Sequence, residues 1–369
     1  MHSKGNLPAT HRIEYLDSLR GIGAVVVTLA HFNCLYPFFK NGDKLFNGVA
    51  AVSVFFVLSG YVLSLKLTKQ KFADFRFASF TVRRWCRLWI PFAAALLLAT
   101  GIQLIFLRIY KTTPSLDAEY LARWMTPITL KKLGLEAYHF YSGNYVAPSW
   151  TLIPELKNSL LLPLGIAIMW RSKSWFFFAA LAGTYFNLLP IGGLHFALGA
   201  YIATHQEQIV SIARKIRFAG LGPLLFCAVY FINPQKLGPL GAWGIWAFAS
   251  AALLVGLLAS PTLQAIASVK PLQILGKCSF GIYLLHWAIM FPVASLCLEF
   301  LPQKGISIGA TWTLSVAIFL AATTVLALFF YKFIEKPAIS IGGSMGRKVD
   351  QWFMTMTQKS QGILSTFAP

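Results

Sequence analysis

Residues 48–65 read GVAAVSVFFVLSGYVLSL, an apolar stretch without a charged side chain. A helix needs roughly 20 apolar residues to cross a bilayer, and this stretch comes close to that length. The rest of the chain is similar, because 57% of its 369 residues are hydrophobic and only 12% are charged. Soluble domains typically carry about 25% charged residues. The composition predicts an integral membrane protein and excludes a nucleic-acid-binding protein, a disordered chain and a secreted disulfide scaffold.

Similar apolar segments recur along the chain and predict an all-α polytopic membrane protein with about ten transmembrane helices. We expect one membrane domain over residues 1–337, closed by a helix stop at Glu335-Lys336-Pro337, and a cytoplasmic tail over residues 338–369. The polar start of the chain predicts no cleavable signal peptide. The expected spans cover residues 20–39, 47–66, 88–108, 150–170, 175–190, 191–204, 218–233, 240–260, 279–300 and 308–333.

The formal net charge of +20 comes from 32 lysines and arginines against 12 acidic residues. In polytopic proteins such cations collect in cytoplasmic loops. A cytoplasmic N-terminus puts about two-thirds of the 32 on the inner side, so both termini are predicted to be cytoplasmic. The longest outer loop, about residues 109–149, is then the expected docking place for a polar partner.

The five cysteines form no CxxC pair and have no metal-ligand spacing. Most of them fall in apolar segments, which favours small packing residues over a disulfide frame. The sequence predicts no metal site.

Ionisable residues inside spans are costly to bury, which makes each of them a functional candidate. Arg20 and His31 are eleven residues apart in the first span, so they share one helix face and lie about 16 Å apart along the axis. Arg20 is then expected at the cytoplasmic rim and His31 near mid-membrane. Histidine is the side chain best suited to take and return a proton near neutral pH. The alternative is a histidine that only bonds a neighbouring helix.

Three arginines, Arg83, Arg84 and Arg87, precede the third apolar segment. Their spacing on a helix predicts a cluster of guanidiniums on about one face. Like charges so placed repel one another, and a phosphate held bidentately relieves that repulsion. The alternative is a cytoplasmic anchor that faces lipid headgroups.

Three further polar residues fall inside apolar segments. Glu155 opens the fourth span and is expected about 8 Å below the outer surface. His286 is expected near mid-membrane, like His31. Ser59 precedes Gly60, which permits close helix approach, and the serine can bond across that gap; packing explains this pair equally well.

The order and placement of these motifs resemble the acyltransferase-3 family, the multispan membrane enzymes that O-acylate bacterial surface polysaccharides. The resemblance covers nearly the whole chain. One departure follows Glu155, where the family usually continues with an aromatic pair and this chain reads Lys157-Asn158-Ser159. The stretches that carry the resemblance are Tyr15 to Gly21, Arg20 to His31, Phe55 to Tyr61, Arg83 to Arg87, Ser149 to Glu155, Ser279 to His286 and Glu335 to Pro337.

The resemblance implies a bacterial inner-membrane enzyme that takes an acyl group, usually acetyl, from cytoplasmic acetyl-CoA and gives it to a sugar hydroxyl on the far side. In this interpretation His31 is the general base and Arg20 stabilises charge on the donor or the oxyanion. Glu155 orients the acceptor or His31, and a covalent acyl-histidine intermediate is a second route. The expected acyl-CoA-binding residues are Arg83, Arg84 and Arg87, with Ser59 and His286 lining the cavity.

Two other function classes account for part of the pattern. A proton- or cation-coupled transporter would use His31, Glu155 and His286 as a relay, but it does not explain the arginine cluster or the lack of half-repeats. The second alternative class is a non-catalytic scaffold in a polysaccharide assembly complex. The expected partners are acyl-CoA, a carbohydrate acceptor and the bilayer, and the sequence does not decide between a monomer and a homo-oligomer.

Overall fold

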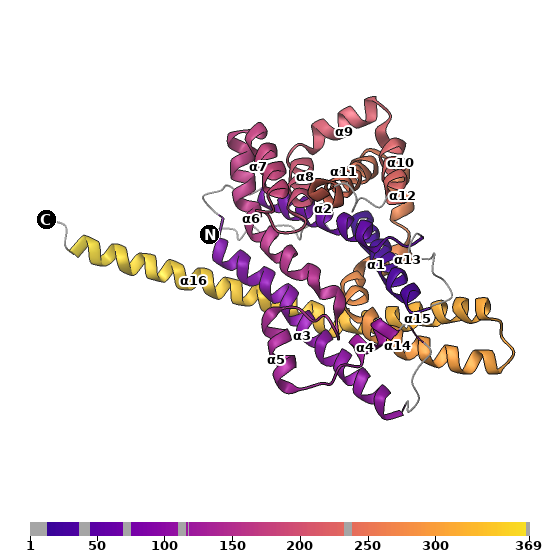
Figure 1. Cartoon of the computed structure of the whole chain (residues 1–369). Coiled ribbons are helices and arrows are strands. Elements are labelled where there is room, and N and C mark those ends of the chain that lie inside the picture. The colour runs from indigo at the N-terminus through magenta and orange to yellow at the C-terminus, as the bar shows by residue number, and fades with distance from the viewer. Residues whose placement is uncertain are drawn as a thin grey trace.

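A computed structural model of the chain describes residues 13–36, 45–68, 75–109, 116, 118–231 and 238–366. These residues form helices and loops, and no strand forms among them beyond one isolated bridge between Ser142 and Val146. Most of the helices gather in one bundle (Figure 1). The all-α prediction is confirmed.

Each of the ten apolar segments contains a helix. These helices are α1 (Glu14–Cys34), α2 (Gly48–Leu67), α3 (Phe77–Ile109), α6 (Leu152–Arg171), α7 (Lys173–Tyr185), α8 (Gly193–Thr204), α10 (Phe218–Tyr230), α11 (Gly238–Ala259), α14 (Ser279–Gln303) and α15 (Ile308–Phe330). The remaining α-helices are α4 (Ala118–Trp124), α5 (Leu130–His139), α9 (Gln206–Lys215), α12 (Pro261–Ala267), α13 (Lys270–Lys277) and α16 (Lys336–Thr366).

Helix length and composition support fewer spans than the sequence predicts. Within the described residues, five helices are long and apolar enough to cross a membrane: α2, α3, α6 with its preceding turn, α14, and α15 with its continuation. A sixth is possible if α11 and α12, bent by 99° at their junction, count as one span. The 12 and 13 residues of α8 and α7 reach only about 18–20 Å, less than the roughly 30 Å of hydrocarbon. The chain is an integral membrane protein, and ten spans stay a prediction.

Close helix packing at Gly60 follows the sequence prediction. A Cβ on Gly60 of α2 would collide with the backbone of Phe196 in α8, and a Cβ on Gly199 of α8 would collide with the backbone at Val57. The two helices therefore meet backbone to backbone. This contact fixes α2, the helix that carries Ser59, against the rest of the bundle.

The predicted helix stop after α15 is wrong. The chain passes through a π-helical turn (Tyr331–Glu335) directly into α16. A proline is tolerated where its missing N–H is not needed, and the π turn next to Pro337 supplies such a place. Helix α16 then packs on α3, where Gly342 lies against Cys86, Gly346 against Arg83, and Asp350 is 3.9 Å from the Arg83 guanidinium. The segment predicted as a tail is therefore helical through residue 366.

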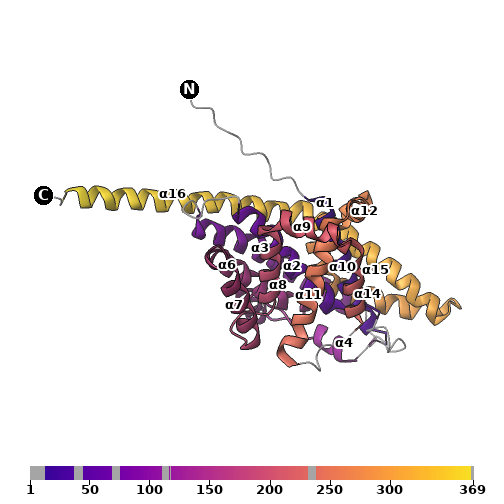
Figure 2. The ribbon, with the colours of Figure 1, turned by 90° about the horizontal axis from the view of Figure 1, so that it is seen from above.

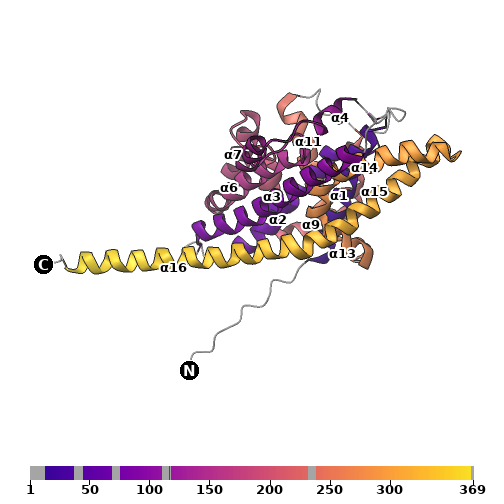
Figure 3. The same ribbon diagram turned by 90° about the horizontal axis from the view of Figure 1, so that it is seen from below.

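Helices α16 and α4 mark opposite edges of the bundle. Figures 2 and 3 show this arrangement from two sides, and in both α16 extends beyond the other helices. The beginning of α1 lies near the edge that α16 follows (Figure 2). The beginning of α1 and helix α16 thus lie at one edge of the molecule. That this edge faces the cytoplasm stays a prediction.

Much of the loop before α6 is buried against the bundle. The side chains of Ser142, Tyr145 and Ser149 are fully buried, and the loop belongs to the predicted outer loop, of which residues 110–115 and 117 lie outside the described residues. The loop satisfies its own polar groups, because Ser149 Oγ accepts from the amide of Ser142 and Ser142 Oγ accepts from the amide of Tyr145. Helix α6 therefore begins within the protein.

The predicted orientation can be tested with cysteines at Lys131 and Lys215. Lys131 lies in α5, in the predicted outer loop, and Lys215 ends α9 on the predicted cytoplasmic side. A membrane-impermeant maleimide is expected to label Lys131→Cys in intact cells and Lys215→Cys only after permeabilisation. Because Cys227 is exposed, both variants are made with Cys227→Ser. The reverse labelling pattern would overturn the orientation.

Candidate active site

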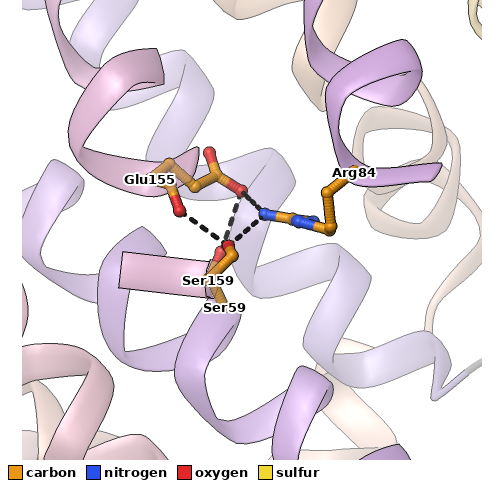
Figure 4. A network of polar contacts seen from close by, with 4 residues as sticks. All are labelled: Ser59, Arg84, Glu155 and Ser159. Carbon is orange, nitrogen blue, oxygen red and sulfur yellow. Dashed lines mark hydrogen bonds and ion pairs between the residues drawn. The ribbon is translucent and has the colours of Figure 1, made fainter. Parts of the chain in front are cut away.

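An ion pair between α3 and α6 is the centre of the first polar cluster. Arg84 Nη2 lies 3.0 Å from Glu155 Oε1 and donates to Ser159 Oγ at 2.7 Å. Ser159 in turn donates to the backbone carbonyl of Glu155, and Ser59 of α2 donates to the Glu155 carboxylate at 3.4 Å. Figure 4 shows the four side chains converging from three helices. A buried guanidinium needs such partners, because an unpaired buried charge is strongly unfavourable.

The Nε of the Arg84 guanidinium is an unused donor. This nitrogen is buried and has no hydrogen-bond partner among the described residues. Arg84 as a whole is only 7% exposed, so the donor is shielded from bulk solvent. The network therefore offers an N–H that a bound acceptor group can use.

Other cations surround this ion pair. Arg20 of α1 interacts electrostatically with Arg84, Arg87 and Glu155, and its guanidinium is 3.6 Å from Asp17. The exposed Lys66, near the end of α2, interacts with Arg84 and Arg87. This cluster thus contains four cations and two carboxylates, and the carboxylates pair with Arg20 and Arg84. The excess positive charge suits a polyanionic ligand.

The two histidines form a second polar cluster. His31 Nδ1 lies 3.1 Å from His286 Nε2, which joins α1 to α14. The edge of Trp287 packs against the His31 ring at 5.5 Å between ring centroids. His286 is fully buried and His31 partly so. His31 thus bonds a neighbouring helix, and its partner there is itself a histidine; a role for His31 as a base stays a prediction.

The buried loop before α6 connects the two clusters. Tyr283, one turn before His286 in α14, bonds Thr151 Oγ1 at 2.9 Å and the carbonyl of Pro148 at 2.9 Å. Trp287 donates to the carbonyl of Asn144 at 2.7 Å. Thr151 stands one turn before Glu155, so α14 and α6 hold the histidine pair and the ion pair in a fixed relation.

The structure separates Arg83 from Arg84 and Arg87, although the sequence placed all three on one face. Adjacent helical residues point about 100° apart, so Arg83 turns to Asp350 of α16 while Arg84 turns into the bundle. Arg87 is exposed and lies near Arg20 and Lys66. The prediction of a single three-guanidinium face is therefore wrong, and Arg87 is the member with no carboxylate partner among the described residues.

The predicted depth of Glu155 also needs correction. An outer position for Glu155 and a cytoplasmic rim position for Arg84 are incompatible with their 3.0 Å ion pair. The buried loop explains the difference, because it carries the start of α6 into the bundle before the helix begins. Glu155 is thus a half-buried residue bonded to Arg84 and Ser59, and among the described residues it bonds neither histidine.

Several residues of the site were not candidates from the sequence. They are Asp17, Lys66, Thr151, Ser159 and Tyr283. Ser159 lies one turn after Glu155, and this i+4 spacing to a candidate residue is a signal that could have indicated it. The partners of Tyr283 depend on the course of the buried loop, which no local spacing shows.

No three His, Cys, Asp or Glu side chains of the described ranges cluster closely enough to hold a metal ion.

A stability measurement tests the buried ion pair. Glu155→Gln leaves the Arg84 guanidinium buried without its counter-charge, which typically costs about 3–5 kcal/mol. We expect a clearly lower thermal midpoint for the purified protein in detergent. Glu119→Gln is the matched control, since Glu119 pairs with Arg123 at an exposed site where such pairs contribute about 1 kcal/mol or less. Equal midpoints for the two variants would show that the Arg84–Glu155 pair does not support the fold.

Comparison with known proteins gives two matches and one negative result. The model of an acyltransferase domain, that of the acyltransferase-3 family, matches residues 13–332. A peptidoglycan O-acetyltransferase, OatA of Listeria monocytogenes, is 25% identical over an alignment of 367 positions, and the match covers 87% of this chain. The match covers 55% of the relative, so the chain spans about half its length. No solved structure matches the chain.

Proposed function

The chain belongs to the acyltransferase-3 family, and we propose that it is a membrane O-acetyltransferase that moves an acetyl group from acetyl-CoA to a hydroxyl of a cell-wall polysaccharide. The match over residues 13–332 supports acyl transfer. The relative that modifies peptidoglycan favours a carbohydrate polymer as acceptor. A bacterial inner-membrane location with cytoplasmic termini fits a donor that is made in the cytoplasm.

The observation that carries the proposal is that α1 carries both a proton acceptor, His31, and one member of the cation cluster, Arg20. Arg20 and His31 lie on this one helix, about 16 Å apart along its axis, and each meets a separate buried cluster. Coenzyme A is long and carries its phosphates away from the thioester. A donor with its phosphates near Arg20 and its thioester near His31 spans such a distance.

The donor phosphates are assigned to the cations that lack a full counter-charge. Arg87 and Lys66 are exposed members of the cation cluster, whereas Arg83 faces Asp350 of α16 and stays a candidate from the sequence alone. Arg20 is close enough to this group to reach the donor or the oxyanion formed at its carbonyl. Arg84, neutralised by Glu155, offers its unused Nε donor.

The proposed reaction is direct transfer. His31 takes the proton of the acceptor hydroxyl as the oxygen attacks the thioester carbonyl. The carbon–sulfur bond then breaks, the acetyl group stays on the acceptor oxygen, and the CoA thiolate takes the proton from His31. In this scheme Glu155 and Ser59 hold Arg84 in place, and the buried helices keep water from the thioester.

Acetyl-CoA turnover tests the proposal. Purified protein in proteoliposomes with acetyl-CoA and soluble peptidoglycan fragments is expected to release free CoA thiol at a rate that depends on both substrates. Heat-denatured protein is the control. Absence of CoA release together with proton flux across the vesicle would instead support a transporter.

A further inference from the structure

The contact between His31 and His286 has the geometry of a hydrogen bond in the plane of both rings. The nitrogen atoms, Nδ1 of His31 and Nε2 of His286, are 3.1 Å apart. The two ring planes are inclined by only 22°, and the ring centroids are 5.2 Å apart. In such a bond one imidazole must donate an N–H and the other must offer a lone pair.

The surroundings of His286 decide which ring donates. Its Nδ1 lies 3.1 Å from the carbonyl oxygen of Ile282, one turn earlier in α14. A carbonyl can only accept, so Nδ1 of His286 carries the hydrogen. In a neutral imidazole the other nitrogen is then bare, and Nε2 of His286 is an acceptor. Nδ1 of His31 must therefore be the donor.

The same reasoning fixes the tautomer of His31. With its hydrogen on Nδ1, the neutral His31 ring has its lone pair on Nε2. We propose that His286 is a positioning residue that holds His31 in this tautomer, so that Nε2 of His31 is the atom that takes the proton of the acceptor hydroxyl. This inference rests on the proposed role of His31 as the base.

The groups around the pair are uncharged. They are the backbone carbonyls of Val27 and Ile282, the indole of Trp287 and the phenol of Tyr283. Among the described residues no carboxylate bonds either ring, and Glu155 bonds Arg84 instead. An imidazole here does what a carboxylate does in a Ser-His-Asp triad, namely orient the base through Nδ1–H. It does so without placing a permanent negative charge in a membrane-embedded interior, where such a charge is costly.

The protonated state of His31 fits the same arrangement. When Nε2 takes a proton, Nδ1–H becomes a stronger donor, and the lone pair of His286 stabilises the imidazolium through a charge-assisted bond. The bond is therefore stronger after proton transfer than before it, which favours the transition state over the ground state.

Two substitutions of His286 separate the bond from the packing. Glutamine keeps a side-chain oxygen that can accept from Nδ1 of His31, whereas phenylalanine fills a similar volume and offers no acceptor. We expect His286→Phe to lower kcat at least about tenfold, with the KM for acetyl-CoA nearly unchanged, because the loss concerns the orientation of the base. His286→Gln is expected to recover most of that loss. The matched control is His195→Phe, since His195 is a buried histidine of α8 that contacts neither ring of the pair.

A spectroscopic readout tests the tautomer without any enzyme assay. Solid-state ¹⁵N NMR of histidine-labelled protein in bilayers distinguishes protonated from bare ring nitrogens, and comparison with His31→Gln assigns the His31 signals. We expect a protonated Nδ1 and a bare Nε2 on His31 of the full-length chain, and a more mixed population in His286→Phe.

Two outcomes would overturn the inference. One is a bare Nδ1 on His31 in the wild-type protein. The other is an equal kcat for His286→Gln and His286→Phe, which would show that His286 only fills space. A protein that never turns over acetyl-CoA contradicts the proposed function instead, and the NMR result then decides the tautomer alone.

Discussion

Replacing His31 with glutamine is expected to lower the rate of acetyl transfer by about 10²- to 10⁴-fold while the protein still folds. Glutamine is polar and similar in length, so it can still bond across to His286 of α14. It cannot take a proton at neutral pH, so the acceptor hydroxyl would lose its base. Initial rates of CoA release at saturating acetyl-CoA and acceptor measure the effect.

His195→Gln is the matched control for this variant, because it makes the same substitution at another buried histidine. It is expected to keep near wild-type turnover. More than about a tenth of wild-type activity in His31→Gln, with an unchanged thermal midpoint, would argue against a base at this position.

Replacing Arg87 with alanine is expected to raise the KM for acetyl-CoA roughly 10- to 150-fold, since hydrogen bonds to charged groups contribute about 1.5–3 kcal/mol. The KM for the acceptor is expected to change little, because Arg87 belongs to the cation cluster and not to the histidine pair. Arg87→Lys should recover part of the loss, because it keeps the charge but loses the bidentate fork. Added salt should weaken acetyl-CoA binding by the wild type, since Arg87 is exposed and its charge is screened.

Arg76→Ala is the control for general charge effects, because Arg76 is also exposed and lies just ahead of the same helix, α3. An unaltered acetyl-CoA dependence in Arg87→Ala would leave Arg87 as an anchor for lipid headgroups. An equal effect of both substitutions would point to nonspecific attraction of the donor by surface charge.

The helices could be predicted from the sequence, whereas the number of them that cross a membrane stays a prediction. An apolar stretch as long as residues 48–65 forms a helix whether it lies in a bilayer or in a buried core. Whether a helix crosses the bilayer depends on where it begins and ends. The turn at Pro190 to Gly193 separates α7 from α8 and leaves both helices short. Pro337 predicted a helix end that the structure does not have, because a π turn leads directly into the next helix, α16.

The sequence named candidate residues for the site, but it did not predict which of them contact one another. Helical periodicity places Arg20 and His31 on one face of α1, and the continuous helix Glu14–Cys34 agrees with this. The Arg84–Glu155 pair depends on a loop that enters the bundle, which periodicity does not describe. One feature of the sequence does indicate burial of this loop. Residues 140–150 contain no charged side chain, which is unusual for a loop exposed to water.

The measurement that tests the central claim most directly is transfer of labelled acetyl from acetyl-CoA to a peptidoglycan fragment by purified protein in proteoliposomes. The wild type is expected to give an ester-linked, alkali-labile label on the carbohydrate together with an equal amount of free CoA, and His31→Gln is expected to give neither above background. Label on the carbohydrate at the same rate with both proteins, or no label with a folded wild type that still carries protons across the membrane, would contradict the account.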